Sequence, residues 1–187
     1  NLGCGQNGAL ILAILALGFA WLDRRPVWAG VVLGALVIKP QLAILLPFIL
    51  AASGRWRTFF ATGASAAALC GLAFSVVGAD GYAAFFANST YARESLNRGL
   101  VDPALMQSLY AGLRVLKTPM VTAYLAQGLL SITAIASVCY IARKYKPDGP
   151  ALGALTVAAT VVATPFMLDY DLLICALPMG WLILTGA

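Results

Sequence analysis

The sequence contains no histidine, and this absence excludes several kinds of chemistry at once. Histidine is the usual general base at neutral pH, the usual partner of a nucleophilic serine or cysteine, and a common zinc ligand. The chain also lacks the GxxxxGK[ST] loop of nucleotide-driven pumps. Its four cysteines form no CxxC pair, so we interpret them as small buried apolar side chains and predict no metal site and no cofactor.

Charged residues are scarce as well. They make up 10% of the 187 residues, whereas 61% are hydrophobic, a composition that no ordinary soluble domain has. We therefore predict an all-α fold, a polytopic bundle of membrane helices that forms one transmembrane domain over residues 1–187. The chain begins without methionine and ends inside an apolar run, so we expect it to be part of a longer protein. The predicted spans are residues 8–22, 27–38, 41–53, 58–78, 120–142, 150–168 and 172–187, with an extracytoplasmic section at 79–119.

The apolar run at 27–53 has a single cation, Lys39, at its centre, followed directly by Pro40 and Gln41. A straight helix would place the ammonium near the bilayer midplane, at a cost of several kcal/mol. It would also place a proline inside the helix, where a backbone hydrogen bond is lost. We predict instead a broken helical hairpin, with two short helices that meet at Lys39-Pro40.

The distribution of basic residues favours this hairpin over a single crossing. Cytoplasmic loops of membrane proteins carry an excess of Lys and Arg. A hairpin puts all the basic turns on one face, whereas a single crossing at 27–53 would divide them. That face then holds the whole net charge of +5, from Arg24, Arg25, Arg55, Arg57, Arg143, Lys144 and Lys146 against Asp23 and Asp148. Membrane orientation explains the charge, so no nucleic-acid partner is expected.

The hairpin brings unusual polar residues to the opposite, extracytoplasmic face. Lys39 is suited to hold a phosphate as a point charge, although a lysine that snorkels to the interface would look the same. Gln6 and Asn7 precede the first span, where Asn7 is either a helix cap or, with Gln6, a hydrogen-bonding partner for a sugar or phosphate. Asp169 and Asp171 are two residues apart, so they share a face only in an extended segment. They are suited to bind a cation, orient sugar hydroxyls or accept a proton, or they form a simple acidic turn.

The section at 79–119 contains one amphipathic repeat, which predicts a helix that lies in the headgroup layer. Asp102 is a suitable N-cap, Pro103 a suitable first residue, and Pro119 ends the pattern. Gln107 and Ser108 lie on the polar side, as candidates for binding a headgroup or for simple exposure to water. The apolar side is formed by Leu105, Met106, Leu109, Leu113 and Leu116.

Five short motifs follow one another along most of the chain, namely GQN, DRRP, AGVVLGALVIKPQ, GRWR and TPFMLDYDL. In this order and spacing they resemble glycosyltransferase family 87, formerly a domain of unknown function. The resemblance implies a membrane glycosyltransferase of the GT-C type in the bacterial plasma membrane. Such an enzyme moves a mannose-like hexose from a polyprenyl-phosphate carrier to a lipid or glycan acceptor on the extracytoplasmic face.

The resemblance also assigns roles to residues. It implies that Lys39 and Gln41 lie near the carrier phosphate, Gln6 and Asn7 near the sugar, and Asp169 and Asp171 at the rim of the cavity. The general base of an inverting transfer would be an aspartate in a loop that precedes Asn1. Many relatives have a histidine near the last motif, and this chain has none. A secondary transporter or flippase remains the alternative, since broken helices with polar tips also form transport sites.

Overall fold

The computed structural model describes residues 7–97 and 103–186. Within these ranges the all-α prediction is confirmed, since the only β pairing is an isolated bridge between Met106 and Leu168. Two helical stretches, in α5 and α7, are long and apolar enough to cross a membrane. The elements are α1 (Gly8–Trp21), α2 (Pro26–Gly34), η2 (Ala35–Ile38), α3 (Pro40–Ala43), α4 (Leu46–Ala52), α5 (Trp56–Asn97), η3 (Pro103–Leu105), α6 (Leu109–Val115), α7 (Met120–Tyr145), α8 (Gly149–Ala163), η4 (Asp169–Cys175) and α9 (Ala176–Thr185).

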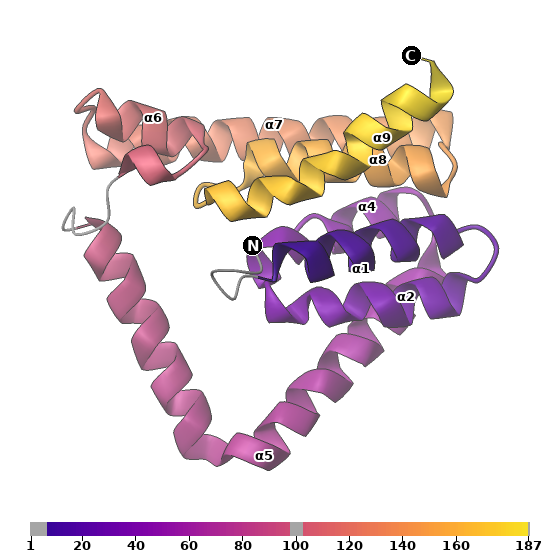
Figure 1. Ribbon diagram of the computed structural model, residues 1–187, viewed down its shortest axis with the longest axis horizontal. Helices are drawn as coiled ribbons and strands as arrows, with labels where there is room; N and C mark the ends of the chain where they lie inside the picture. Colours follow the sequence, from indigo (N-terminus) through magenta and orange to yellow (C-terminus); the bar gives the residue numbers. More distant parts are fainter. Residues whose placement is uncertain (1–6, 98–102, 187) are drawn as a thin grey trace.

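The broken hairpin has the predicted tip. Lys39 has φ −136° and ψ 73°, outside the helical region, and Pro40 opens α3. In Figure 1, α2 and α4 run in opposite directions on either side of this tip. The second arm, however, is not the single helix expected over 41–53. It is divided into α3 and α4, because Pro47 has no N–H to donate to the carbonyl of Ala43.

At the end of the bundle opposite the hairpin tip, three loops are tied together by one ion pair (Figure 1). The Arg55 guanidinium donates to a carboxylate oxygen of Asp23 over 2.5 Å and to the carbonyl of Pro147 over 3.2 Å. The second carboxylate oxygen of Asp23 accepts from the Gly149 N–H over 2.6 Å. The three basic turns therefore lie at one end of the bundle, as the hairpin requires.

This ion pair predicts a pH-dependent contribution to stability. Burial raises the pKa of Asp23, but hydrogen bonds from Arg55 and Gly149, with the charge of Arg55, outweigh it and leave the pKa below its ordinary value of 3.8. We expect Asp23→Asn to lower the free energy of unfolding by about 0.5–1 kcal/mol at pH 7. The difference from the wild type should vanish as the pH falls through the lowered pKa, because the wild-type carboxylate is then protonated too. Thermal unfolding in detergent across this pH range measures it, and a gap that does not depend on pH would contradict the assignment.

The first arm of α5 packs closely on α2 through small residues, as the Ala-, Gly- and Ser-rich composition of this region suggests. A Cβ added at Gly30 would lie 2.5 Å from the Cβ of Ala61 and 2.6 Å from the carbonyl oxygen of Thr58. One added at Gly34 would lie 2.5 Å from the Cβ of Ser65. The helix axes are therefore as close as glycine allows.

Gly30→Leu is accordingly expected to force the two helices apart and to lower the free energy of unfolding by about 1–3 kcal/mol. Gly71→Leu on α5 is the matched control, because a Cβ added there would meet no atom within 4 Å. Thermal unfolding of both variants in detergent tests the packing. Equal melting temperatures for the two variants would show that α2 and α5 are not in close contact.

Beyond the predicted span at 58–78, α5 continues as a helix to Asn97 after a sharp kink, so much of the section at 79–119 is helical. The kink lies at Gly78, whose φ of 68° favours glycine. Figure 1 shows the result as a V of two arms, which projects away from the other helices.

The prediction of a single amphipathic helix after Asp102 is wrong. Asp102 itself lies outside the described residues. The chain forms only one 3-10 turn, η3, and then an irregular step before α6. A tertiary contact takes precedence here over the helical pattern, because Met106 pairs with Leu168 and the Gln107 N–H donates to the Met167 carbonyl over 2.7 Å. Ser108 caps α6 instead, accepting from the Ala111 N–H over 3.1 Å.

Candidate functional site

Lys39 lies at the hairpin tip in a charged cluster with two residues of η4. Its ammonium donates to a carboxylate oxygen of Asp171 and lies 4.7 Å from the ring centroid of Tyr170. The Lys39 and Asp171 side chains are only 12% and 3% exposed. A cation in this position is stabilised by a carboxylate and by the electron-rich face of an aromatic ring.

The two aspartates do not act as a pair, since η4 turns them to different partners. Asp171 is buried against Lys39, whereas the exposed Asp169 accepts from the side-chain amide of Gln107 over 2.9 Å. In the parts of the chain that the structure describes, no group of three potential metal ligands among His, Cys, Asp and Glu lies together. Because the two carboxylates have different partners, the geometry favours a charge-balancing role for Asp171 over a shared cation site.

Ser108 joins the same region from the start of α6. Its hydroxyl donates to the carbonyl of Pro165 over 2.6 Å, in the segment that leads from α8 to η4. Five of the predicted residues, Lys39, Gln107, Ser108, Asp169 and Asp171, are thus brought to the segment 165–171 or its immediate contacts.

Asn7 begins α1 but does not cap it, since its side chain makes no capping hydrogen bond. Among the residues that the structure describes, its buried side-chain oxygen has no hydrogen-bond partner. A capping role for the Asn7 side chain is therefore excluded. The alternative, that its side-chain oxygen accepts a hydrogen bond from a sugar or phosphate, stays a prediction. Gln41 is exposed on α3, and Gln6 lies outside the described residues.

The structure adds Tyr170, which the motif contains but which we did not single out from sequence. Burial, and then the negative charge of Asp171, raise the pKa of the Tyr170 hydroxyl. The hydroxyl is therefore protonated at neutral pH and available as a hydrogen-bond donor.

Gln127, a buried amide in the N-terminal third of α7, is a second residue that sequence reasoning missed. Its side-chain oxygen accepts from the Tyr110 N–H over 3.1 Å, and its nitrogen donates to the Val162 and Ala163 carbonyls over 3.1 and 3.3 Å. One side chain thus holds the start of α6 against the end of α8. A lone amide in an apolar span was the available signal.

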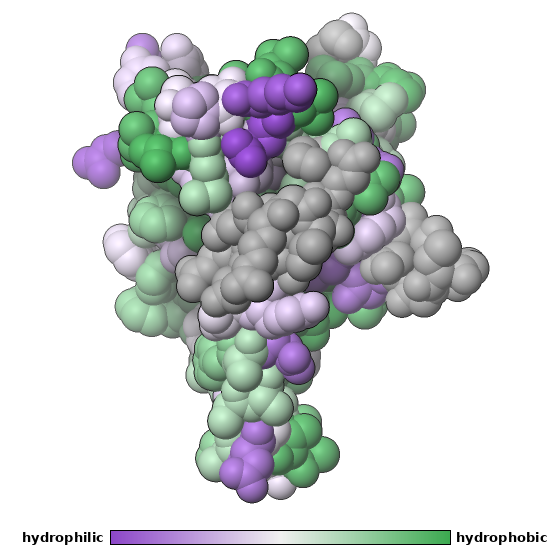
Figure 2. All heavy atoms as spheres, turned by 90° about the vertical axis from the view of Figure 1, so that its left-hand side faces the viewer, coloured by the Kyte–Doolittle hydropathy of each residue, from purple (hydrophilic) through white to green (hydrophobic). Residues whose placement is uncertain are grey.

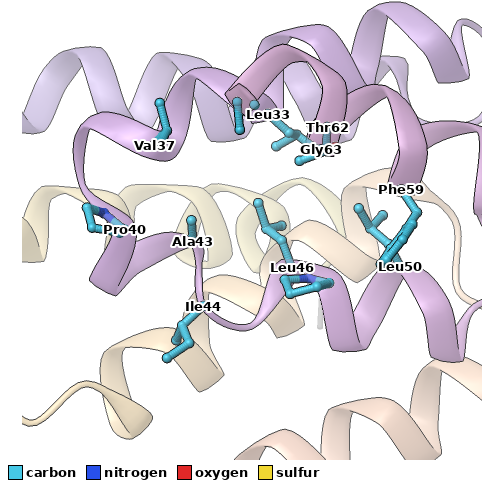
Figure 3. Close-up of a pocket in the computed structure, with 13 residues that line it drawn as sticks. Leu33, Val37, Pro40, Ala43, Ile44, Leu46, Leu50, Phe59, Thr62 and Gly63 are labelled. Carbon is cyan, nitrogen blue, oxygen red and sulfur yellow. The ribbon is translucent and has the colours of Figure 1, made fainter. Parts of the chain in front are cut away.

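An apolar groove of about 290 Å³ separates the two arms of the hairpin and opens beside α5 (Figure 3). It begins at Pro40, directly after Lys39, and reaches Leu50 and Phe59 at its other end. Figure 3 shows Leu33 and Leu46, from opposite arms, directed into this space. A long apolar ligand in the groove would have one end at Pro40, the residue that follows Lys39 in the chain.

A second cavity, of about 630 Å³, lies between α6 and the helices α7 and α8. Gln107 and Ser108 line one part of it, whereas most of its wall is formed by Leu and Val side chains. This cavity lies at the same end of the molecule as Lys39 and η4, because Gln107 in its lining donates to Asp169. Figure 2 shows this end face-on, with hydrophilic residues among hydrophobic ones and α5 projecting below.

The sequence profile of glycosyltransferase family 87 matches residues 1–167, most of the chain. The chain belongs to glycosyltransferase family 87. No curated protein and no solved structure matches it. As a family 87 member, the protein is a membrane-associated glycosyltransferase with a sugar donor and an acceptor. The match ends before Asp169, so the roles of η4 in this family 87 enzyme rest on the geometry around Lys39.

Proposed function

We propose that this glycosyltransferase moves a mannose-like hexose from a polyprenyl-phosphate carrier to a lipid or glycan acceptor, on the extracytoplasmic face of the bacterial plasma membrane. The observation that carries the proposal is the position of Lys39. It is a nearly buried cation at a helix break, and an apolar groove begins at the next residue. A lipid phosphate has this pairing of anion and apolar chain.

Lys39 is placed to bind the phosphate that leaves with the carrier. Its ammonium has three donors, of which Asp171 engages one. The remaining donors stabilise the phosphate as it takes the electron pair of the broken bond to the anomeric carbon. Asp171 then serves as a positioning residue that keeps the ammonium at the hairpin tip.

The acceptor hydroxyl forms the new bond to the anomeric carbon and gives its proton to a general base. Asp169 and Asp171 are engaged by Gln107 and Lys39, which supports a base from another segment. We propose the aspartate expected before Asn1 for this step. The side-chain oxygen of Asn7, which has no partner in the described part of the chain, is a further acceptor, suited to bind a sugar hydroxyl.

A transfer assay tests the proposal. The protein is reconstituted in vesicles with polyprenyl phosphate that carries radioactive mannose, together with an extract of membrane glycolipids and glycans. We expect label to appear in new products while free polyprenyl phosphate accumulates. Movement of intact labelled carrier across the bilayer without release of polyprenyl phosphate would instead show a flippase.

A further inference from the structure

We infer that the end of the bundle opposite the hairpin tip binds an anionic phospholipid, whose phosphate lies at Arg25 and Arg57. This binding is independent of the proposed transfer. The end, on the right in Figure 1, carries six exposed basic side chains, namely Arg24, Arg25, Arg57, Arg143, Lys144 and Lys146. Among the residues that the structure describes, none of the six lies within 4 Å of a carboxylate.

The two carboxylates of the same loops are already engaged within the protein. Asp23 accepts from Arg55 over 2.5 Å and from the Gly149 N–H over 2.6 Å. Asp148 caps α8 and accepts from the Ala151 N–H over 2.9 Å. The positive charge of this end is therefore available to an anion from outside the chain.

Two of the cations are carried by adjoining helix starts. The Thr58 hydroxyl of α5 donates to the Pro26 carbonyl of α2 over 3.0 Å, so the first turns of the two helices lie side by side. Arg25 directly precedes Pro26, and Arg57 directly precedes Thr58. Each guanidinium is suited to form paired hydrogen bonds to phosphate oxygens. One phosphate head group between the two helix starts can be bound by both.

The same helix starts expose aromatic and apolar side chains beside the cations. We call this surface the α2–α5 patch; it consists of Arg25, Trp28 and Val31 at the start of α2 and Trp56, Arg57 and Phe60 at the start of α5. Trp28 and Trp56 are 61% and 52% exposed, and tryptophan is typical of the level between head groups and acyl chains. Val31 and Phe60 follow about one helical turn further along and are also exposed.

This order of cation, aromatic ring and apolar side chain matches the order of phosphate, glycerol and acyl chain in a phospholipid. A soluble anion would engage the arginines only and would leave the apolar part of the patch without a partner. A zwitterionic lipid brings its own cation, which the two arginines repel. The patch therefore fits a lipid with a net negative head group.

Arg25→Gln/Arg57→Gln tests the site, and Arg143→Gln/Lys146→Gln is the matched control. The control removes the same charge from the same end of the bundle but from the end of α7. Lys144 is kept, because it packs over the rings of Tyr140 and Tyr145 at 5.1 and 5.2 Å. The probes are phosphatidylglycerol and phosphatidylcholine, each with a photoreactive diazirine in one acyl chain, in nanodiscs of phosphatidylcholine.

The measurement is the labelling of peptides that contain Val31 or Phe60, as the ratio of the phosphatidylglycerol probe to the phosphatidylcholine probe. We expect a ratio well above one in the wild type and in the control variant. In Arg25→Gln/Arg57→Gln the ratio should fall at least about fivefold, which corresponds to about 1 kcal/mol, the usual contribution of one basic residue at an anionic membrane surface.

An equal fall in both double variants would overturn the inference, since the charge would then act as a general field without a site on α2 and α5. A wild-type ratio of one would overturn it as well. Circular dichroism shows that the variants are folded, which we expect because the substituted side chains are exposed and have no carboxylate partner among the described residues.

Discussion

Lys39→Met should lower the rate of sugar transfer by about 10²–10³-fold, the usual effect of removing one group that stabilises developing negative charge. The same change leaves Asp171 buried and without its counter-ion, which should lower the free energy of unfolding by about 3–5 kcal/mol. Transfer from labelled polyprenyl phosphomannose and thermal unfolding in detergent measure the two effects separately.

The double variant Lys39→Met/Asp171→Asn separates catalysis from folding. Removing both charges leaves no unpaired buried ion, so most of the lost stability should return. Transfer should remain as low as in the single variant, because the phosphate still lacks its cation. A double variant that is stable and transfers sugar at the wild-type rate would remove Lys39 from the site and leave it as a structural ion pair.

Gly63→Leu should raise the KM for a long-chain polyprenyl donor about tenfold or more. Gly63 lines the groove between the hairpin arms, and a Cβ added there would meet no atom within 4 Å, so a leucine side chain starts in open space and extends into the groove. Displacing two methylene groups of the carrier costs about 1.6 kcal/mol, which corresponds to this change in affinity. Leucine also favours the helix over glycine, so folding should not suffer.

The comparison uses two donors and one control. A short-chain analogue that ends before Gly63 should be used equally well by Gly63→Leu and by the wild type. Gly71→Leu, on the same helix but outside the groove, should keep the wild-type KM for both donors. A KM that rises equally for long and short donors would show that the groove does not hold the chain.

The features that sequence predicted correctly are those with a local chemical signal. Lys39-Pro40 inside an apolar run indicated the break, and the basic turns indicated that the chain returns to its starting end. Arg55 in contact with Asp23 shows that it does. Which side of the membrane each end faces stays a prediction.

The features that sequence did not predict depend on contacts between distant segments. Lys39 and Asp171 are 132 residues apart, and no local pattern indicates that they pair. The continuous helix expected after Asp102 was wrong because Met106 forms a bridge to Leu168, which interrupts an otherwise suitable helical repeat. The division of the second hairpin arm, by contrast, had a local signal in Pro47 that we did not use.

Gln127 gives α7 a mechanical role at the site. Because its amide is bonded both to the backbone at Tyr110 and to the last carbonyls of α8, α6 cannot move outward without stretching bonds that also hold the approach to η4. A ligand that widens the cavity under α6 would therefore strain these bonds at the end of α8, the helix that leads to η4. If that strain changes the affinity at Lys39 by some factor, a ligand at Lys39 changes the affinity of the cavity by the same factor, because such coupling is reciprocal.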